Sequence, residues 1–449
     1  MNTLDASIYE NLAAKFTNCT ANIGVIGLGY VGLPLCLALG DAGYSVVGFD
    51  VDENKPAHIL NGKSYIKSIA SESIAEVLRS GKLDATTDMS RLSEMDAILI
   101  CVPTPIDSHL SPDLSYVIDS CKVILKHLRK GQLIVLESTT YPGTTKEVVL
   151  PILQESGLKV GQDVFLAFSP EREDPGNINF STSQIPKVVG ADDVKSQKLA
   201  VTLYNEFVSE TVPVSSTSTA EAVKITENVF RAVNIALVNE LKVIFDKMDI
   251  NVWEVIEGAK SKPFGFMPFY PGPGLGGHCI PIDPFYLTWK AKSIGVETHF
   301  IELAGQINRS MPLHVVSVLM DALSARSKKS INGSKILLLG LTYKKNIDDT
   351  RESPALELMK LIEDRDGKVD YFDPYVEVVA QDPHYPSLIG RKSIVWDTQK
   401  ISEEYDAVLI ATDHDNVDYC AIAENCEIVI DTRNACARAG AKMTNVILA

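Results

Sequence analysis

One cysteine near the middle of the chain has surroundings that suit a covalent nucleophile. Cys279 follows GPGLGGH and precedes IPIDP, so it lies in a glycine-rich segment where little side-chain bulk covers the sulfur. A lone cysteine is more often a small buried residue, but this context favours catalysis. A thiolate can attack an aldehyde to give a thiohemiacetal, whose loss of hydride yields a thioester that water hydrolyses. This chemistry requires a nearby cation or base.

Candidate partners for the thiol come from a predicted helix and two loops. Lys224 and Asn228 are four residues apart in a helical pattern, so they share a face and could stabilise an alkoxide or hold a water, although solvated helix faces look similar. The segment SPEREDPG places Glu171 and Arg172 after a predicted strand, as ordinary surface loops also do. Asp283, four residues beyond the cysteine, could orient a lysine or water, or serve only in a turn.

A glycine fingerprint predicts a dinucleotide site near the start of the chain. Gly27, Gly29 and Gly32 form G-x-G-x-x-G between a β-rich run and a helical pattern, where a backbone turn can approach a pyrophosphate at the helix N-terminus. Asp50 ends the next predicted strand, where a carboxylate accepts ribose hydroxyls and repels a 2′-phosphate, so NAD is favoured over NADP. The segments VPTP and ESTT follow later strands. The predicted cofactor residues are Gly27, Gly29, Tyr30, Val31, Gly32, Asp50, Val102, Pro103, Thr104, Ser138 and Thr139.

The elements that must position these residues alternate between β-rich and helical segments, which indicates parallel strands with crossover helices. From Ser215 onward two long helical patterns follow, one of about thirty residues and one over roughly 301–325 that is subject to interruption at Pro312. A second alternating segment begins at Lys335 and lacks the glycine fingerprint. The strands are expected at residues 22–27, 45–49, 97–102, 133–136, 164–168, 187–189, 335–340, 368–373, 407–411 and 428–430.

The predicted fold class is therefore α/β with three domains. An N-terminal Rossmann-type NAD-binding domain is expected over residues 20–214, a central helical domain with a long helix and the cysteine loop over 215–328, and a C-terminal Rossmann-like α/β domain over 329–449.

Composition excludes several classes of protein. A formal net charge of −16 opposes attraction to nucleic acid or an anionic membrane. Eight cysteines without a CxxC pair argue against a disulfide framework or a structural zinc site, so no metal is expected. The first twenty residues lack a signal peptide and no apolar run could cross a bilayer, so we expect a cytoplasmic protein. An acidic protein with an anionic substrate must concentrate its cations locally.

The motifs together resemble the UDP-glucose/GDP-mannose dehydrogenase family over about residues 21–440. GGHCIPIDPFYL and SPEREDPGN resemble its branch of UDP-N-acetylglucosamine 6-dehydrogenases. The resemblance implies a four-electron oxidation of the sugar C6 hydroxyl with two NAD per sugar. It also implies catalytic roles for Cys279 as nucleophile, Glu171 as general base or water-positioning acid, Lys224 and Asn228 as the oxyanion-stabilising and substrate-binding pair, Asp283 as the acid that supports water and lysine, and Thr139 as a hydroxyl near the nicotinamide.

Further motifs extend the resemblance to the nucleotide. YKKNIDDTRES implies that Tyr343 and Lys344 contact the nucleotide sugar and that Arg351 reaches the NAD phosphates. DTRN implies that Arg433 also binds the nucleotide sugar. These cations meet the requirement that the acidic composition sets. The implied substrate-binding residues are Glu171, Arg172, Lys224, Asn228, Lys262, Gly276, Tyr343, Lys344 and Arg433. His278 is interpreted as structural.

The substrate and the reaction type leave alternatives. UDP-GlcNAc is the leading substrate, for bacterial surface polysaccharide such as O-antigen, with UDP-GalNAc, UDP-ManNAc or UDP-glucose as alternatives. A two-electron dehydrogenase of the hydroxyacid type, in which Lys224 is the acid or base, would yield one NADH per substrate rather than two. A sensor that binds NAD and a nucleotide would show no turnover. We also expect a homodimer or higher homo-oligomer through the central helices.

Overall fold

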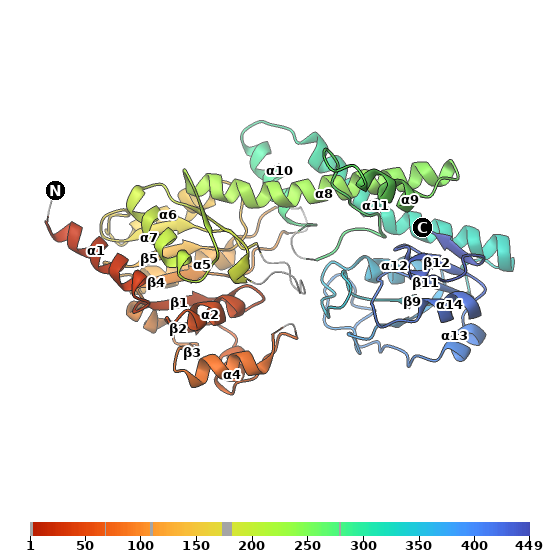
Figure 1. Ribbon diagram of the computed structural model, residues 1–449, viewed down its shortest axis with the longest axis horizontal. Helices are drawn as coiled ribbons and strands as arrows, with labels where there is room; N and C mark the ends of the chain where they lie inside the picture. Colours follow the sequence, from red (N-terminus) through yellow and green to blue (C-terminus); the bar gives the residue numbers. More distant parts are fainter. Residues whose placement is uncertain (1–2, 68, 108–110, 173–181, 278–279) are drawn as a thin grey trace. The chain divides into compact units, whose positions relative to one another are not determined.

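The computed structural model describes residues 3–67, 69–107, 111–172, 182–277 and 280–449. The chain divides into two compact units, Met1–Glu227 with Phe285–Val296, and Asn228–Pro284 with Glu297–Ala449. The long helix α8 (Thr217–Lys247) contributes to both units and is drawn as one unbroken helix in Figure 1. The three-domain division proposed from the sequence stays a prediction.

The first unit is built on an eight-stranded sheet with the order β3-β2-β1-β4-β5-β6-β7-β8. Its first six strands have the Rossmann order and are parallel, whereas β6 pairs with β7 in the antiparallel sense, contrary to the all-parallel expectation. Antiparallel neighbours need no crossover helix. The strands are β1 (Asn22–Ile26), β2 (Ser45–Phe49), β3 (Leu83–Thr86), β4 (Ala97–Ile100), β5 (Leu133–Leu136), β6 (Phe165–Phe168), β7 (Lys187–Gly190) and β8 (Thr211–Val214). The helices are α1 (Thr3–Thr17), α2 (Gly32–Asp41), α3 (Asn54–Leu60), α4 (Ser71–Arg79), α5 (Ser115–His127), α6 (Leu150–Gln154) and α7 (Val194–Asn205), with a 3₁₀ turn at Met89–Glu94, a π-helical turn at Thr145–Val149 and a second 3₁₀ turn at Thr182–Gln184.

Helices cover both faces of this sheet, so its central strands are apolar throughout. In β5, Leu133 and Val135 pack into the cluster formed with α1, α2 and α7, while Ile134 and Leu136 pack into the cluster formed with α5 and α6. This alternation follows from the two-residue period of a strand. The carboxyl ends of β1, β2, β4, β5 and β6 carry the predicted cofactor and catalytic segments.

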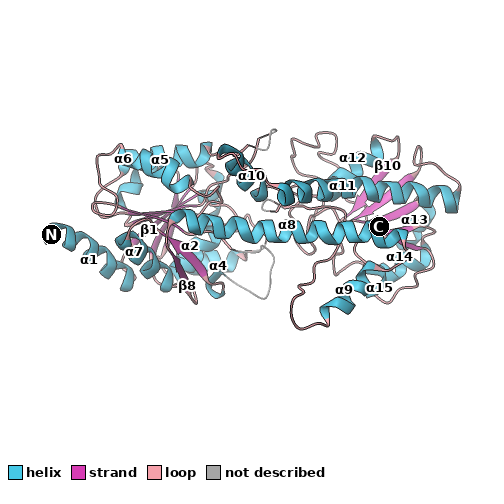
Figure 2. Cartoon of the chain, turned by 90° about the horizontal axis from the view of Figure 1, so that it is seen from above, coloured by secondary structure: helices cyan, strands magenta, loops and turns pink. Residues whose placement is uncertain are grey.

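The second unit contains a five-stranded parallel sheet with the order β10-β9-β11-β12-β13. Ile336 and Leu338 of β9 pack with α11 and α12, while Leu337 and Leu339 pack with α13 and α14. Figure 2 shows these two pairs of helices on opposite sides of the strands. The strands are β9 (Lys335–Leu339), β10 (Lys368–Phe372), β11 (Ala407–Ile410), β12 (Val429–Asp431) and β13 (Val446–Leu448). The remaining helices are α9 (Val252–Lys260), α10 (Asp283–Ser293), α11 (His299–Ala322), α12 (Pro354–Glu363), α13 (Thr398–Glu404), α14 (Tyr419–Asn425) and α15 (Ala435–Arg438), with a π-helical turn at Leu323–Ser327.

The expected interruption of the second long helix at Pro312 is wrong. Helix α11 continues through this buried proline. A proline at this position leaves the carbonyl oxygen of Asn308 without its helical partner. That oxygen lies beside Gly274, 3.4 Å from where a Cβ of this residue would stand, so the helix packs against the glycine-rich segment at the position of the proline.

No helix in the described ranges has both the length and the apolarity that crossing a membrane would require.

Candidate active site

The glycine turn after β1 has the geometry of a dinucleotide cradle. Gly27 has φ 94°, and a Cβ there would stand 2.6 Å from the carbonyl oxygen of Cys101. A Cβ on Gly32 would stand 1.9 Å from the oxygen of Gly27, so only glycine lets α2 begin this close to the strand. A Cβ on Gly29 would meet no atom within 4 Å. The turn is therefore open at its middle glycine, beside the first N–H groups of α2, which suits the approach of a pyrophosphate.

Asp50 lies directly beside this turn and is almost completely buried. Its Oδ2 accepts a hydrogen bond from the N–H of Leu28 at 2.8 Å and forms an ion pair with Lys55 Nζ at 2.8 Å. Tyr65 donates its hydroxyl to the carbonyl oxygen of Leu28 at 2.6 Å. The predicted acid thus holds the fingerprint in shape as well as bringing a carboxylate to the end of β2. Tyr30 and Val31 are half-buried. Sequence analysis missed Lys55, whose position five residues after the acid was a local signal.

The segments after β4 and β5 are joined to one another. Ser138 donates its hydroxyl to the carbonyl oxygen of Val102 at 2.7 Å. The carbonyl oxygen of Thr104 accepts the hydroxyl of Tyr286 at 2.9 Å, while Pro103 is exposed. Thr139 is half-buried between these anchored positions.

Glu171 lies in a buried charged cluster that sequence analysis did not foresee. Lys187 Nζ is 2.5 Å from Glu137 Oε2 and 3.4 Å from Glu171 Oε2, and Tyr204 donates its hydroxyl to Glu137. Burial lowers the pKa of Lys187, but the two carboxylates outweigh it and the pKa is raised above its ordinary value. The available signals were Lys187 at the start of KVVG and Glu137 at the end of LIVLE, because each is a charged residue directly beside an apolar strand.

The long helix α8 carries the predicted lysine and amide. Lys224 is 6% exposed and forms no hydrogen bond or ion pair with another residue that the structure describes. One turn later, Asn228 donates its amide to Asp283 Oδ2 at the start of α10. Asn228 and Asp283 are therefore brought together, as a pair of buried polar side chains. The amine of Lys224 therefore lies in surroundings from which most water is excluded.

The other predicted residue on the SPEREDPG segment is engaged in an ion pair. Arg172 Nη2 is 2.6 Å from Glu227 Oε1 of α8, and its Nη1 donates to the carbonyl oxygen of Pro186 at 2.7 Å. These contacts fasten the start of this segment to the helix. The residues from Glu173 onward in this motif lie outside the described residues.

The glycine-rich segment before the cysteine packs on residues of the second sheet's loops. A Cβ on Gly276 would stand 2.4 Å from Cβ of Tyr343, and Gly277 donates its N–H to the carbonyl oxygen of Arg351 at 2.9 Å. A Cβ on Gly272 would stand 2.5 Å from Nη1 of Arg433. The structure thus gathers several predicted substrate-binding residues around this segment. Cys279 itself, with His278, lies outside the described residues.

Three further predicted cations, Lys262, Arg351 and Lys344, belong to the same unit of the chain. Lys262 is exposed and lies 4.9 Å from the ring centroid of Phe264. Arg351 forms a two-pronged ion pair with Asp349, at 2.6 Å for its Nη2. Lys344 is half-buried, and its carbonyl oxygen accepts the hydroxyl of Thr342 at 2.8 Å.

Comparison with known proteins agrees with the motifs. The NAD binding domain of the UDP-glucose/GDP-mannose dehydrogenase family matches residues 21–208, its central domain 218–310 and its UDP binding domain 337–438. A UDP-N-acetyl-D-glucosamine 6-dehydrogenase of Pseudomonas aeruginosa is 39% identical over 87% of this chain and 90% of that protein. A UDP-N-acetyl-D-mannosamine dehydrogenase of Pyrococcus horikoshii is 36% identical over 92% of this chain and 95% of that protein.

Solved structures show the same relationship. The structure of the UDP-D-ManNAc dehydrogenase from Pyrococcus horikoshii has a TM-score of 0.83 and 35% identity, and covers 92% of this chain and 96% of that one. The resemblance inferred from the motifs is confirmed. The chain belongs to the UDP-glucose/GDP-mannose dehydrogenase family and is an NAD-dependent nucleotide-sugar 6-dehydrogenase.

Proposed function

We propose that the chain oxidises the C6 hydroxyl of a UDP-N-acetylhexosamine to the uronic acid, with UDP-GlcNAc as the leading substrate. Two relatives named as GlcNAc enzymes are 39% and 36% identical to the chain, and a relative named as a ManNAc enzyme is 36% identical. The observation that carries the proposal is the buried Lys224, one helical turn before the Asn228–Asp283 pair. The product would enter synthesis of a bacterial surface polysaccharide.

The proposed reaction has three stages. The C6 alcohol loses a hydride to NAD and a proton, which gives the aldehyde. The thiolate of Cys279 adds to the aldehyde carbon, and the thiohemiacetal loses a second hydride to another NAD, which gives a thioester. Water then hydrolyses the thioester, which releases the carboxylate and restores the thiol.

The neighbouring residues would act on charge and on water. Lys224 and Asn228 would hold the developing oxyanion, because donors are most effective where water is excluded. Glu171 would position or activate the hydrolytic water, with Asp283 in support. Thr139 would place its hydroxyl near the reacting carbon. NAD would supply the hydride acceptor, one molecule for each of the two oxidation steps, and the open middle of the glycine turn, with Asp50, would hold each one in turn.

The nucleotide would be held by residues of the second unit. Tyr343, Lys344 and Arg433 would contact the UDP moiety, with Gly276 close to them and Lys262 and Arg172 as further cations. Arg351 would reach the NAD phosphates. These cations would supply locally what a chain with a net charge of −16 lacks overall.

Self-association through the central helices is a further part of the proposal. Phe230, Leu237 and Ile244 of α8 are each between 44% and 51% exposed and recur every seven residues, so they form one apolar stripe. A second copy of the chain is the partner we propose for it. Light scattering of Leu237→Glu should report a smaller particle than the native protein, and an unchanged mass would contradict this.

The test is a substrate panel with the purified chain and NAD. UDP-glucose, UDP-GlcNAc, UDP-GalNAc and UDP-ManNAc are supplied in turn, and the absorbance of reduced cofactor is followed. We expect turnover on an acetamido sugar, greatest with UDP-GlcNAc; turnover on UDP-glucose alone would refute the substrate class. Cys279→Ala should lose net turnover. The control Cys420→Ala should keep it, because it removes a half-buried thiol that donates a hydrogen bond to the carbonyl oxygen of Ala439.

A further inference from the structure

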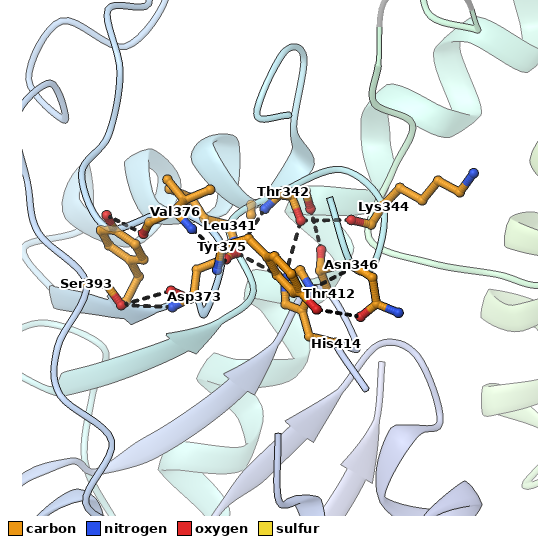
Figure 3. A network of polar contacts seen from close by, with 12 residues as sticks. Leu341, Thr342, Lys344, Asn346, Asp373, Tyr375, Val376, Ser393, Thr412 and His414 are labelled. Atoms are coloured by element: carbon orange, nitrogen blue, oxygen red, sulfur yellow. Dashed lines mark hydrogen bonds and ion pairs between the residues drawn. The ribbon is translucent and has the colours of Figure 1, made fainter. Parts of the chain in front are cut away.

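Three neighbouring strands of the second sheet end at a buried polar cluster to which the proposed reaction assigns no role (Figure 3). Asp373 follows β10, the loop 341–346 follows β9, and His414 follows β11. The side chains of Asp373 and His414 are fully buried and form an ion pair or hydrogen bond of 3.0 Å between Oδ2 and Nε2.

Both carboxylate oxygens of Asp373 accept hydrogen bonds. Its Oδ2 accepts the N–H of Leu341 at 2.6 Å in addition to the contact with His414, and its Oδ1 accepts the N–H groups of Tyr375 and Val376 at 2.8 and 3.0 Å. Burial opposes ionisation, but the hydrogen bonds from His414 and the backbone outweigh it, so the pKa of Asp373 lies below its usual value. The carboxylate is a fixed acceptor for the ring.

The other side of the imidazole determines its tautomer. Asn346 donates its backbone N–H to His414 Nδ1 at 3.0 Å, so Nδ1 is an acceptor and carries no proton. The proton must then lie on Nε2, which faces Asp373. Thr342 agrees with this assignment, because its hydroxyl donates to the carbonyl oxygen of Lys344 and offers lone pairs to Nε2 at 3.3 Å. The ring is a neutral connector between a carboxylate and a backbone amide.

Asn346 has a backbone conformation that requires such support. Its φ is 61°, in the left-handed region that side chains other than glycine rarely adopt. Its side chain is also fixed, because Nδ2 donates to Asp415 Oδ2 at 2.6 Å and Oδ1 accepts the N–H of Asp415 at 3.1 Å. The loop therefore turns back at a residue that His414 and Asp415 hold together.

The same loop carries Tyr343 and Lys344 between its two anchored ends. Tyr343 in turn packs on Gly276 and Gly277, which directly precede the segment with the cysteine. We propose that His414, oriented by Asp373, is a positioning residue that holds loop 341–346 in the conformation that binds the nucleotide part of the substrate. The inference rests on the proposed function and adds a residue that acts through Asn346 rather than on the substrate.

Two substitutions separate the two bonds of the ring. His414→Gln places a donor near the position of Nε2 but removes the acceptor for Asn346, whereas His414→Asn keeps an acceptor near the position of Nδ1 and loses the donor to Asp373. Tyr419→Phe is the matched control, because Tyr419 donates to the carbonyl oxygen of His414 at 3.0 Å and its loss leaves the ring unchanged.

Binding of UDP and of NAD to the full chain is measured by calorimetry for each variant. We expect His414→Gln to weaken UDP binding about tenfold, because the hydrogen bond from the Asn346 N–H is lost and loop 341–346 is no longer held in place. The NAD affinity of this variant should stay within about twofold of that of the native chain. His414→Asn should bind UDP better than His414→Gln, and Tyr419→Phe should match the native chain even if its melting temperature falls. In turnover, KM for the UDP-sugar should rise while kcat changes less.

The outcomes divide clearly. If the native chain binds UDP and His414→Gln binds it equally well, the positioning role is wrong while the proposed function stands. If the native chain binds no UDP, the proposed function fails and this inference with it. Nitrogen NMR of the native chain with isotope-labelled histidine tests the inference without a variant: a proton on Nε2 of His414 is expected, and a proton on Nδ1 would overturn it.

Discussion

The three glycines of the turn after β1 should respond differently to the same added methyl group. Gly29→Ala places its Cβ where no atom lies within 4 Å, at a backbone conformation that alanine can adopt. The unfolded chain loses freedom, so the folded state should be unchanged or more stable by about 0.4–1 kcal/mol. Gly32→Ala places its Cβ 1.9 Å from the carbonyl oxygen of Gly27. Such an overlap forces the backbone apart, and overpacking of this kind costs roughly 1–3 kcal/mol or more.

Gly29→Ala should weaken NAD binding although it leaves the folded state at least as stable as that of the native chain. The methyl of Gly29→Ala would occupy the space through which a pyrophosphate approaches the N–H groups of α2. Losing one or two charge-assisted hydrogen bonds, each about 1.5–3 kcal/mol, corresponds to a rise in Kd of roughly ten- to a hundredfold or more. Calorimetric titration with NAD and thermal unfolding measure the two quantities, and UDP binding by the same variant is the internal control. Native NAD affinity in a well-folded Gly29→Ala chain would refute this assignment of the cofactor cradle.

Three other substitutions test the buried charges. Lys187→Met leaves Glu137 and Glu171 buried without their cation and should lower the free energy of unfolding by about 3–5 kcal/mol in urea titrations, with the double variant Lys187→Met, Glu137→Gln recovering part of the loss. Asp50→Asn should weaken NAD binding and narrow the preference for NAD over NADP about tenfold, measured as the ratio of the two Kd values. Glu221 of α8 is fully buried and accepts the N–H groups of Gly143 and Thr145. Burial raises its pKa to about 7, so its proton stabilises the folded state below the unfolded pKa near 4.5. This contribution, roughly 3 kcal/mol, is lost as pH rises through 7. Melting temperatures from pH 5 to 8 should therefore fall more steeply for the native chain than for Glu221→Gln, and parallel curves would contradict the assignment.

The local parts of the cofactor site could be predicted because their signals are local. The glycine spacing, the strand before it and Asp50 after the next strand all act within about thirty residues, and each has a stereochemical reason. The strands β2 and β5 were predicted with their observed bounds for the same reason, since buried parallel strands are continuous apolar runs.

Other parts depend on contacts between distant segments. The helix α1 and the strands β3, β8 and β13 were missed. These strands have only three or four residues each, so pairing with a neighbouring strand, rather than a local sequence pattern, defines them. The cluster of Glu137 and Lys187 exists only because β5 and β7 bring a carboxylate and an ammonium to the same buried place. No sequence signal distinguishes a buried histidine such as His414, whose tautomer is determined by Asp373 and Asn346, from an ordinary surface histidine.

Sequence patterns also overestimated the effect of proline. A single proline within a helical pattern predicts a break, yet in α11 the freed carbonyl oxygen and the ring are accommodated beside Gly274. Gly274 lies 38 positions away along the chain, so a rule based on neighbouring residues could not include this contact.

The yield of reduced cofactor per sugar tests the central claim most directly. With limiting UDP-GlcNAc, excess NAD and the native chain, the reaction is run to completion and the NADH formed is divided by the sugar consumed. Oxidation of the alcohol through a thioester to the carboxylate predicts two NADH per sugar and a uronic acid product. A yield of one NADH, with an aldehyde or ketone as product, would contradict the account.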